Sequence, residues 1–471
     1  MDRSTAILIA LAAYFLALLG LGLLARSRTH DAAGFYLGGR TLGPWVAALA
    51  ANASSSSAWS LVGVSGFACK EGLAALWLLP GCIGGFVLNW LCVAPRLRDA
   101  TGSAITLTEF LAGPPGTPLR RPIVVAASVL TIGSLGLYVA AQMQATGRPF
   151  QLAVDASPVV GILLGAGMTL GYTLLGGYLA ASITDTLQGL LMVAVAVVVP
   201  IAAVCRFGGV DAFADAVAAV EAPGFTTGFG DRSGTVALGF ALGLCGIGLG
   251  YPGQPHAVNK FMGMAPNASM AVARTVGIGW AVLLFAGMIV TGLAARAAFG
   301  VAPPDHETAL YATSHALFPP LVDGIVLAAV LAAIMSTVDS QLLVCASSAT
   351  HDLGLGRRRG AAGMLAAARW TVLVVGVAAT AAALLLPASV FDNVLFAWSA
   401  LGAAFGPLLL VRLCRGPVAP AFALAAIVTG GSTAIAGSYV TVLAPGFADR
   451  VLSWLLAGFL ALVGSRRRQG H

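Results

Sequence analysis

The chain is 471 residues long, and 58% of these residues are hydrophobic while only 9% are charged. A soluble domain carries about 25% charged residues, so this composition excludes an ordinary water-soluble fold and indicates an integral membrane protein. The net charge of +7 does not indicate nucleic-acid binding, because the basic residues are scattered between the apolar stretches. The seven cysteines match no metal-ligand spacing, and we expect them to be small buried hydrophobic residues.

Apolar stretches long enough to cross a bilayer recur about thirteen times along the chain. The apolar run from Ile7 to Leu24 is longer than the h-region of a signal peptide and lacks a small-residue cleavage site, so we expect a retained helix. The sequence thus predicts an all-α integral membrane protein. The expected spans cover residues 5–25, 43–68, 73–94, 122–146, 156–178, 182–204, 235–259, 271–299, 320–349, 367–386, 389–412, 417–443 and 450–465.

Positive charges set the orientation of such a protein, because cytoplasmic segments carry an excess of Lys and Arg. If the N-terminus lies outside and the spans alternate, most of the 25 Lys and Arg residues fall on the cytoplasmic side. These include Arg28, Lys260, Arg357–Arg359 and the tail residues Arg466–Arg468. We therefore predict a multi-pass protein of the plasma membrane with its N-terminus outside and its C-terminus in the cytoplasm.

The second expected span contains a dense group of hydroxyl side chains between Ala51 and Ser60. The four consecutive residues Ser54–Ser57 are poor helix formers, because their hydroxyls compete for nearby backbone groups. Free carbonyls at membrane depth are tolerated only inside protein or beside a water-filled cavity. A helix broken at this depth is the usual way in which a transporter exposes carbonyl oxygens to a cation. The pattern therefore predicts transport of a solute together with an ion.

The sixth expected span begins with a polar island that contains Asp185, Thr186 and Gln188. Ionisable residues inside membrane spans cost about 2.5–3.5 kcal/mol on insertion scales and usually serve function. An acid near the membrane interface could also be a simple charge at a helix N-terminus. On the sequence alone, both interpretations stay open.

The seventh expected span is interrupted between Gly248 and His256. Pro252 and Pro255 remove two backbone donors and disfavour the helical conformation in the residues before them. This span is therefore also expected to be discontinuous. Because it lies five spans after the first interrupted one, the two should run in opposite directions, as in an inverted repeat with its binding site between the broken helices.

The ninth expected span carries hydroxyls along one helix face. Ala333, Ser336, Thr337 and Ser340 follow a spacing of three, four and seven residues, and Asp339 flanks this face. Two hydroxyls and a backbone carbonyl are hard oxygen ligands that suit a small alkali cation. The alternative is that these Ser and Thr side chains only bond the carbonyl one turn back, as is common in membrane helices.

Several stretches together resemble the sodium:solute symporter family, and the sodium/proline symporter branch is the most similar part of it. The resemblance implies a LeuT-like core of ten helices, built as two inverted repeats of five with two discontinuous helices. The whole chain would be a single transporter domain, with repeats at 43–204 and 235–412, an extra N-terminal helix at 5–25 and two C-terminal helices at 417–465. The similar stretches are Phe35–Pro44, Ala53–Trp59, Gly176–Tyr178, Thr184–Thr186, Gly250–His256, Met335–Thr337, Ser340–Leu343 and Trp398–Pro407.

The resemblance also implies a sodium site between the second and ninth spans. A second cation would lie beside it, at Asp185, Ser336, Asp339 and Ser340. Asp339 stands where a hydroxyl residue is commoner in the family, so it could strengthen a cation site or titrate as a proton group. One ion or two, and sodium or protons, therefore stay open. The first sodium would be held by the carbonyls of Ala53, Ser56 and Ala333 and by the hydroxyls of Ser336 and Thr337.

The solute positions match the sodium/proline branch less closely. The branch typically has an acidic residue where this chain has Ser55, and a Trp where it has Ile247. Tyr138 and Tyr251 would be aromatic walls of a cavity between the broken helices, although both could be ordinary core or interface tyrosines. The candidate solute residues are Ser54, Ser55, Ser57, Trp59, Tyr138, Ile247, Tyr251 and Gln254.

These patterns predict sodium-coupled symport of a small organic solute into the cytosol, with proline or another small amino acid as the first expectation. A small carboxylate as solute, coupling to protons, and a nutrient sensor built on a transporter fold are the alternatives. A channel would need continuous polarity along several spans, whereas the polar groups here form isolated islands. No nucleophile–base pair, phosphate-binding loop or His-rich motif indicates an enzyme. The expected partners are the solute, Na+ and the lipid bilayer, with no nucleic acid and no obligate protein partner.

Overall fold

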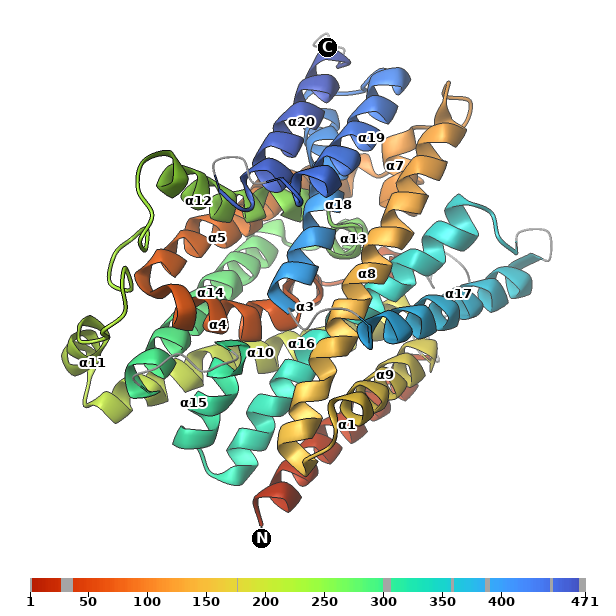
Figure 1. Cartoon of the computed structure of the whole chain (residues 1–471). Coiled ribbons are helices and arrows are strands. Elements are labelled where there is room, and N and C mark those ends of the chain that lie inside the picture. The colour runs from red at the N-terminus through yellow and green to blue at the C-terminus, as the bar shows by residue number, and fades with distance from the viewer. Residues whose placement is uncertain are drawn as a thin grey trace.

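The computed structural model describes residues 2–26, 37–175, 177–299, 306–356, 360–385, 390–440 and 444–465. These residues form helices joined by turns, and the two isolated β-bridges among them link Leu42 with Met264 and Val418 with Ser465 (Figure 1). The all-α prediction is therefore confirmed. The orientation of the termini stays a prediction, because the spans are identified by length and composition alone. Several residues used to predict the orientation or the family resemblance lie outside the described ranges: Arg28, Phe35, Gly176, Arg357–Arg359 and Arg466–Arg468.

The helices follow one another along the chain with few long connections. The first half comprises α1 (Arg3–Arg26), α3 (Pro44–Ala58), α4 (Val64–Glu71), α5 (Leu78–Leu88), α6 (Ala94–Ala100), α7 (Leu107–Ala112), α8 (Arg120–Val154), α9 (Pro158–Leu175), α10 (Tyr178–Phe207) and α11 (Val210–Ala218). The second half comprises α12 (Gly234–Gly246), α13 (Pro255–Met262), α14 (Met270–Phe299), α15 (Ala309–Leu317), α16 (Pro320–Ser347), α17 (Gly360–Ala383), α18 (Val390–Arg415), α19 (Pro420–Gly437) and α20 (Ser453–Val463).

Most of the expected spans appear as membrane-length helices. Ten helical segments of the described chain are long and apolar enough to cross a bilayer, and one of them, Pro44–Ala100, covers two expected spans. The apolar helix Pro158–Gly171 is shorter. The total of thirteen spans, and the division into two inverted repeats, stay predictions.

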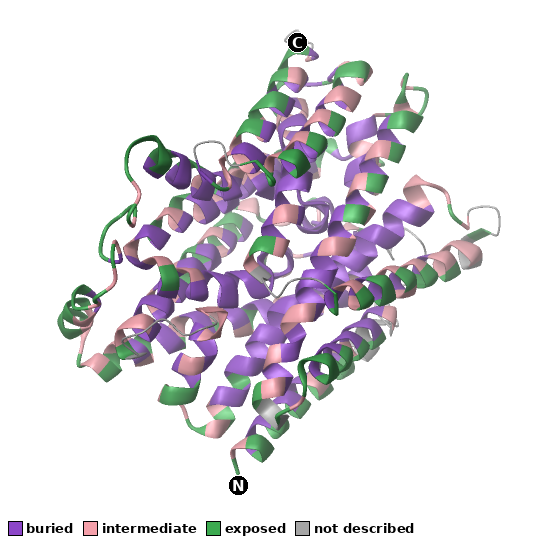
Figure 2. Ribbon diagram, viewed as in Figure 1, coloured by how far each residue is buried: buried purple, intermediate pink, exposed green. Residues whose placement is uncertain are grey.

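Two helices form the centre of the molecule. In α16 and α18, 83% and 89% of the membrane-length window is buried inside the protein, against 22% in α17. Figure 2 shows the same contrast as a buried interior surrounded by helices with exposed outer faces. α3 packs against α10, α13, α14 and α16, so the broken second span lies in the buried interior, away from the outer, lipid-accessible faces.

The second span is broken at Ser57, as the serine run predicts. Ser57 has φ of 32° and ψ of −177°, which interrupts the helix at the end of α3. The chain then continues through a π-helical turn, Trp59–Gly63, into α4. A non-glycine residue in such a conformation costs on the order of 1–3 kcal/mol and persists only where its surroundings hold it. Here the surroundings do so with hydrogen bonds, which are described with the site below.

The seventh span is also discontinuous. α12 ends at Gly246, a 3₁₀ segment covers Ile247–Gly253, and Gln254 is extended before α13 begins at Pro255. The interrupted segment packs closely on α18, where the indole Nε1 of Trp398 donates a hydrogen bond of 3.0 Å to the Ile247 carbonyl. The prediction of two discontinuous helices is therefore confirmed.

Gly250 provides a test of this packing. A Cβ atom at Gly250 would lie 2.1 Å from Nε1 of Trp398, whereas a Cβ at Gly279 on α14 would have no neighbour within 4 Å. Overpacking a buried site typically costs about 1–3 kcal/mol. We therefore expect Gly250→Ala to lower the apparent melting temperature of the purified protein in detergent, while Gly279→Ala leaves it unchanged. Equal melting temperatures for the two variants would contradict the observed fit of Trp398 against the break.

Candidate cation and solute site

The predicted sodium ligands meet where α3 breaks against α16. The Ser336 hydroxyl lies 3.3 Å from the Ala53 carbonyl and 3.2 Å from the Ala333 carbonyl. The Thr337 hydroxyl lies 3.0 Å from the same Ala333 carbonyl. All four residues are buried. The structure thus brings four of the five predicted ligands together where α3 contacts α16. Ala53 and Ser336, which meet here, are 283 residues apart in the sequence.

Ser56, the fifth predicted ligand, lies in the same turn. Its carbonyl accepts the backbone N–H of Trp59, and its buried hydroxyl has no hydrogen-bond partner among the described residues. The hydroxyls of Ser336 and Thr337 do bond carbonyls one turn back, as the alternative interpretation of the ninth span supposed. They also face α3, so the helix-stabilising bonds and the oxygen cluster occur together.

The broken backbone is held by side chains of two other helices. The Ser57 N–H donates to the Thr337 hydroxyl at 3.1 Å, and the Ala58 N–H donates to the Gln142 side-chain carbonyl on α8, also at 3.1 Å. The Tyr138 hydroxyl lies 3.1 Å from the Ser57 hydroxyl. The sequence alone does not single out Gln142, which lies about one turn after Tyr138 on an apolar helix and gives only its polarity as a signal.

A second polar group surrounds Asp185 on α10. The hydroxyls of Ser54 and Ser340 lie 3.1 Å and 3.3 Å from Oδ2 of Asp185 and 3.2 Å from each other. The Nζ atom of Lys260 on α13 lies 2.9 Å from the same oxygen. Asp185 is therefore part of the buried interior and does not simply cap the start of α10, which favours the functional interpretation of the sixth span. From the sequence alone, Lys260 is expected only to be a cytoplasmic charge.

Asp339 does not join this hydrogen-bonded group. Its side chain is buried on α16, and neither carboxylate oxygen has a hydrogen-bond partner among the described residues. Within the described residues there is also no group of three or more His, Cys, Asp or Glu residues that could hold a metal ion. The polar centre therefore consists mainly of hydroxyl and carbonyl oxygens, which are hard ligands.

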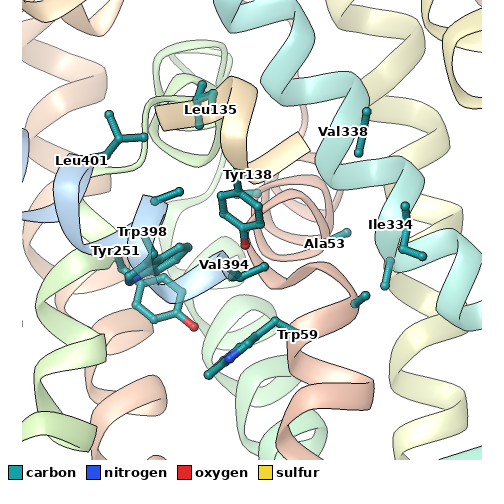
Figure 3. Packing of buried hydrophobic residues seen from close by; sticks show 14 of the residues in the cluster. Ala53, Trp59, Leu135, Tyr138, Tyr251, Ile334, Val338, Val394, Trp398 and Leu401 are labelled. Carbon is teal, nitrogen blue, oxygen red and sulfur yellow. The ribbon is translucent and has the colours of Figure 1, made fainter. Parts of the chain in front are cut away.

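Aromatic side chains lie on the other side of the α3 break. Tyr251 packs against Phe86 and Trp398, with ring centres 4.5 Å and 4.6 Å away. Trp59 packs against Phe285 and Phe391 at 6.2 Å and 5.5 Å. In Figure 3 the hydroxyl ends of Tyr138 and Tyr251 both point toward the middle of the view, above the ring of Trp59.

The remaining predicted solute residues make contacts within the protein. The Ser55 hydroxyl donates to the Asn52 carbonyl at 3.1 Å within its own helix. The Gln254 amide donates to the carbonyls of Gly250 and Trp398 at 3.3 Å and 3.0 Å, so it fastens the second break to α18. Ser54 lies with Asp185, apart from the aromatic group. Trp398 hydrogen-bonds to both Ile247 and Gln254, whereas in the sequence it is only the first residue of the stretch Trp398–Pro407.

Two broken membrane helices beside a buried polar centre are typical of a secondary transporter. Residues 35–430 match the family model described as "Sodium:solute symporter family". The chain is 37% identical to the osmoregulated proline transporter OpuE of Bacillus subtilis, covering 92% of this chain and 88% of that protein. It is 34% identical to the high-affinity proline transporter PutP of the same organism, covering 95% and 96%. The chain therefore belongs to the sodium:solute symporter family and is a transporter, not an enzyme.

Solved structures show the same fold. A Na+-coupled sialic acid symporter in a substrate-bound outward-open state aligns with a TM-score of 0.80 over 100% of both chains, at 17% sequence identity. MhsT in complex with L-phenylalanine aligns with a TM-score of 0.57 over 89% of this chain and 97% of that chain, at 12% identity. The predicted LeuT-like fold class is confirmed by these similarities.

The hydroxyls of Ser336 and Thr337 can be tested together. Interactions of this kind with a charged group are worth about 1.5–3 kcal/mol each, and 1.4 kcal/mol corresponds to tenfold. We therefore expect Ser336→Ala/Thr337→Ala to weaken the apparent sodium affinity by at least about tenfold. The measurement is solute uptake as a function of sodium concentration in proteoliposomes.

A matched control is Thr169→Ala on α9, since the Thr169 hydroxyl is buried and bonds the Gly165 carbonyl one turn back. This variant should keep the wild-type sodium dependence. An unchanged sodium dependence in the double variant, with normal insertion, would refute the assignment of Ser336 and Thr337 as ligands.

Proposed function

We propose that this protein couples the inward movement of sodium to the uptake of proline, or of a similarly small amino acid, across the plasma membrane. Its relatives support the solute, since OpuE and PutP are named as proline transporters and a 36% identical protein of Staphylococcus saprophyticus is named sodium/proline symporter 2. The observation that carries the ion is the meeting of the Ala53 and Ala333 carbonyls with the Ser336 and Thr337 hydroxyls.

The sodium ion would lie between α3 and α16, held by the carbonyls of Ala53, Ser56 and Ala333 and the hydroxyls of Ser336 and Thr337. The Thr337 hydroxyl also accepts the Ser57 N–H, and the Ser57 hydroxyl contacts Tyr138. A cation that draws Thr337 toward the carbonyls therefore alters the support of the break. Ion and solute would then share a coupling free energy through Ser57.

The solute would lie beside the two breaks, among Ser57, Trp59, Tyr138 and Tyr251. The Ser57 and Ala58 N–H groups at the α3 break already donate to Thr337 and Gln142, so the aromatic rings, which suit a compact apolar ring or side chain, are the features that support this solute. Gly250 and Ala58 are the small residues at the two breaks. Because Ser55 and Ile247 replace the acid and the Trp of the sodium/proline branch, we expect a looser fit than in a dedicated proline carrier.

The membrane potential would drive accumulation. Moving one positive charge inward contributes about 2.3 kcal/mol per 100 mV, which corresponds to roughly fiftyfold accumulation of a solute carried with one sodium ion. The proposed orientation, with the N-terminus outside and the C-terminus cytoplasmic, places this movement toward the cytosol.

Uptake into proteoliposomes tests the proposal directly. Under an imposed inward sodium gradient, we expect labelled proline or another small amino acid to accumulate, and an equal proton gradient without sodium to be ineffective. The panel should include small carboxylates, sugars and nucleosides. Sodium-dependent uptake of sugars or nucleosides alone would overturn the solute assignment, and uptake driven by protons alone would overturn the ion assignment.

Tyr251→Ala tests the solute side of the site. Removal of this buried ring deletes apolar contact worth roughly 1.5–3 kcal/mol, so we expect the apparent KM for the solute to rise on the order of tenfold or more, with a smaller change in maximal rate. Tyr439→Ala is the matched control, because Tyr439 is 81% exposed. An apparent KM for Tyr251→Ala equal to that of the control would remove Tyr251 from the solute site.

A further inference from the structure

Lys260 on α13 is a lysine enclosed by the protein. Its side chain is 1% exposed and that of Asp185 is 0% exposed, with 2.9 Å between Nζ and Oδ2. Nζ also lies 3.1 Å from the Ser182 hydroxyl and 4.8 Å from the centre of the Tyr178 ring. A lysine is almost never fully buried unless it is paired. The buried position of Lys260 therefore depends on its ion pair with Asp185.

The ammonium group lies at the oxygen that a second coupling cation would use. Oδ2 of Asp185 is approached by Lys260, by the Ser54 hydroxyl and by the Ser340 hydroxyl at 2.9, 3.1 and 3.3 Å. A carboxylate oxygen offers about two lone-pair sites. These three neighbours use that capacity at Oδ2, whereas Oδ1 of Asp185 is buried and has no hydrogen-bond partner among the described residues. A sodium ion at Oδ2 itself would therefore have to displace the ammonium.

Lys260 balances the charge of the one carboxylate with which it forms an ion pair, that of Asp185. A further cation here would have to be compensated by Asp339, a second buried acid close enough to interact electrostatically with both Asp185 and Lys260. Asp339 lies next to Ser340 on α16, but neither of its carboxylate oxygens hydrogen-bonds to Lys260 or to any other described residue. Asp339 therefore contributes no ligand to the position at Oδ2.

Lys260 also lines a small cavity beside this position. The cavity has a volume of about 10 Å³, and both polar and apolar side chains line it: Ile105, Tyr178, His256, Asn259, Lys260, Ser340, Leu343, Val344 and Ser347. A space of this size holds about one water molecule. The ammonium and the Ser340 hydroxyl thus border one small space that a bound ion and its hydration would need.

We propose that the Lys260 ammonium is a tethered cation that takes the place of a second coupling ion at Asp185, Ser54 and Ser340. It is carried by α13 and stays with the protein, so the oxygen cluster of Ala53, Ala333, Ser336 and Thr337 is left to bind the transported sodium. This inference rests on the proposed function, since it concerns the ion that accompanies the solute.

The ion pair and its hydroxyl neighbours also connect four helices of the core. α13 is the second half of the broken seventh span, and Asp185 belongs to α10. Through Ser54 and Ser340 the same carboxylate contacts α3 and α16. A movement of α13 therefore carries the positive charge with it, whereas a free ion at Asp185 would be released to the cytosol.

Counting charges tests the inference. Reversal potentials in proteoliposomes should give one positive charge per solute for the wild type, because the ammonium is not released. Lys260→Gln removes the charge and leaves Asp185 in place, so a free cation can enter, and the ratio should rise to two. Lys260→Arg keeps a positive charge and should stay at one, as should the double variant Lys260→Gln/Asp185→Asn.

Equilibrium binding of radioactive sodium to purified protein gives a second count without solute. We expect one ion per wild-type molecule and two per Lys260→Gln molecule; if the neutral variant instead admits a proton, the charge ratio still rises to two. Lys260→Ala serves as a second neutral replacement if Lys260→Gln does not fold. Two sodium ions on the wild type, or a charge ratio of one in a folded neutral variant, overturns the role of Lys260. A wild type that binds no sodium would overturn the proposed function itself.

Discussion

The capping of a broken helix inside the membrane is the constraint on which the rest of the structure depends. No water in the bilayer core can satisfy the backbone groups that Ser57 frees, so protein must do it. The Ser57 N–H is taken by Thr337 of α16 and the Ala58 N–H by Gln142 of α8. These contacts fix the position of α16 and α8 against α3. Because Thr337 is also a proposed sodium ligand, the group that supports the break is one that the ion would engage.

The same break separates two chemically different surfaces of α3. Ser54 and Ser57 are three residues apart and would share one face of a regular helix. The Ser54 hydroxyl lies with Asp185 and Ser340, whereas the Ser57 hydroxyl lies with Tyr138. Ser54 pairs with Ser340 and Ser57 with Thr337, so α3 and α16 pass each other in opposite directions. The ion pair of Asp185 and the aromatic residue Tyr138 are thus contacted from positions one helical turn apart on α3, and Ser57 connects Tyr138 to Thr337.

Both breaks and the hydroxyl face of α16 could be predicted from the sequence, because each is decided by local chemistry: consecutive serines, closely spaced prolines, and a helical spacing of hydroxyls. The contacts of Lys260, Gln142 and Trp398 could not. Lys260 and Asp185 are 75 residues apart, and no local pattern records which long side chain reaches which carboxylate. A lysine near the end of an apolar span has the same sequence appearance whether it faces the cytoplasm or a buried acid. Only the packing of α13 against α3 and α16 distinguishes the two cases.

A tethered ammonium and a free ion have different energetic consequences. Each free cation that crosses with the solute adds about 2.3 kcal/mol per 100 mV of driving force, whereas a lysine that returns with α13 adds nothing over a full cycle. The tethered charge, however, neutralises Asp185 at every sodium concentration, so the buried carboxylate is never left unpaired between transport events. On the proposed role of Lys260, the protein concentrates less steeply than a two-ion carrier would. Such a protein needs only one sodium ion, bound from outside at Ser336 and Thr337, before it can carry the solute.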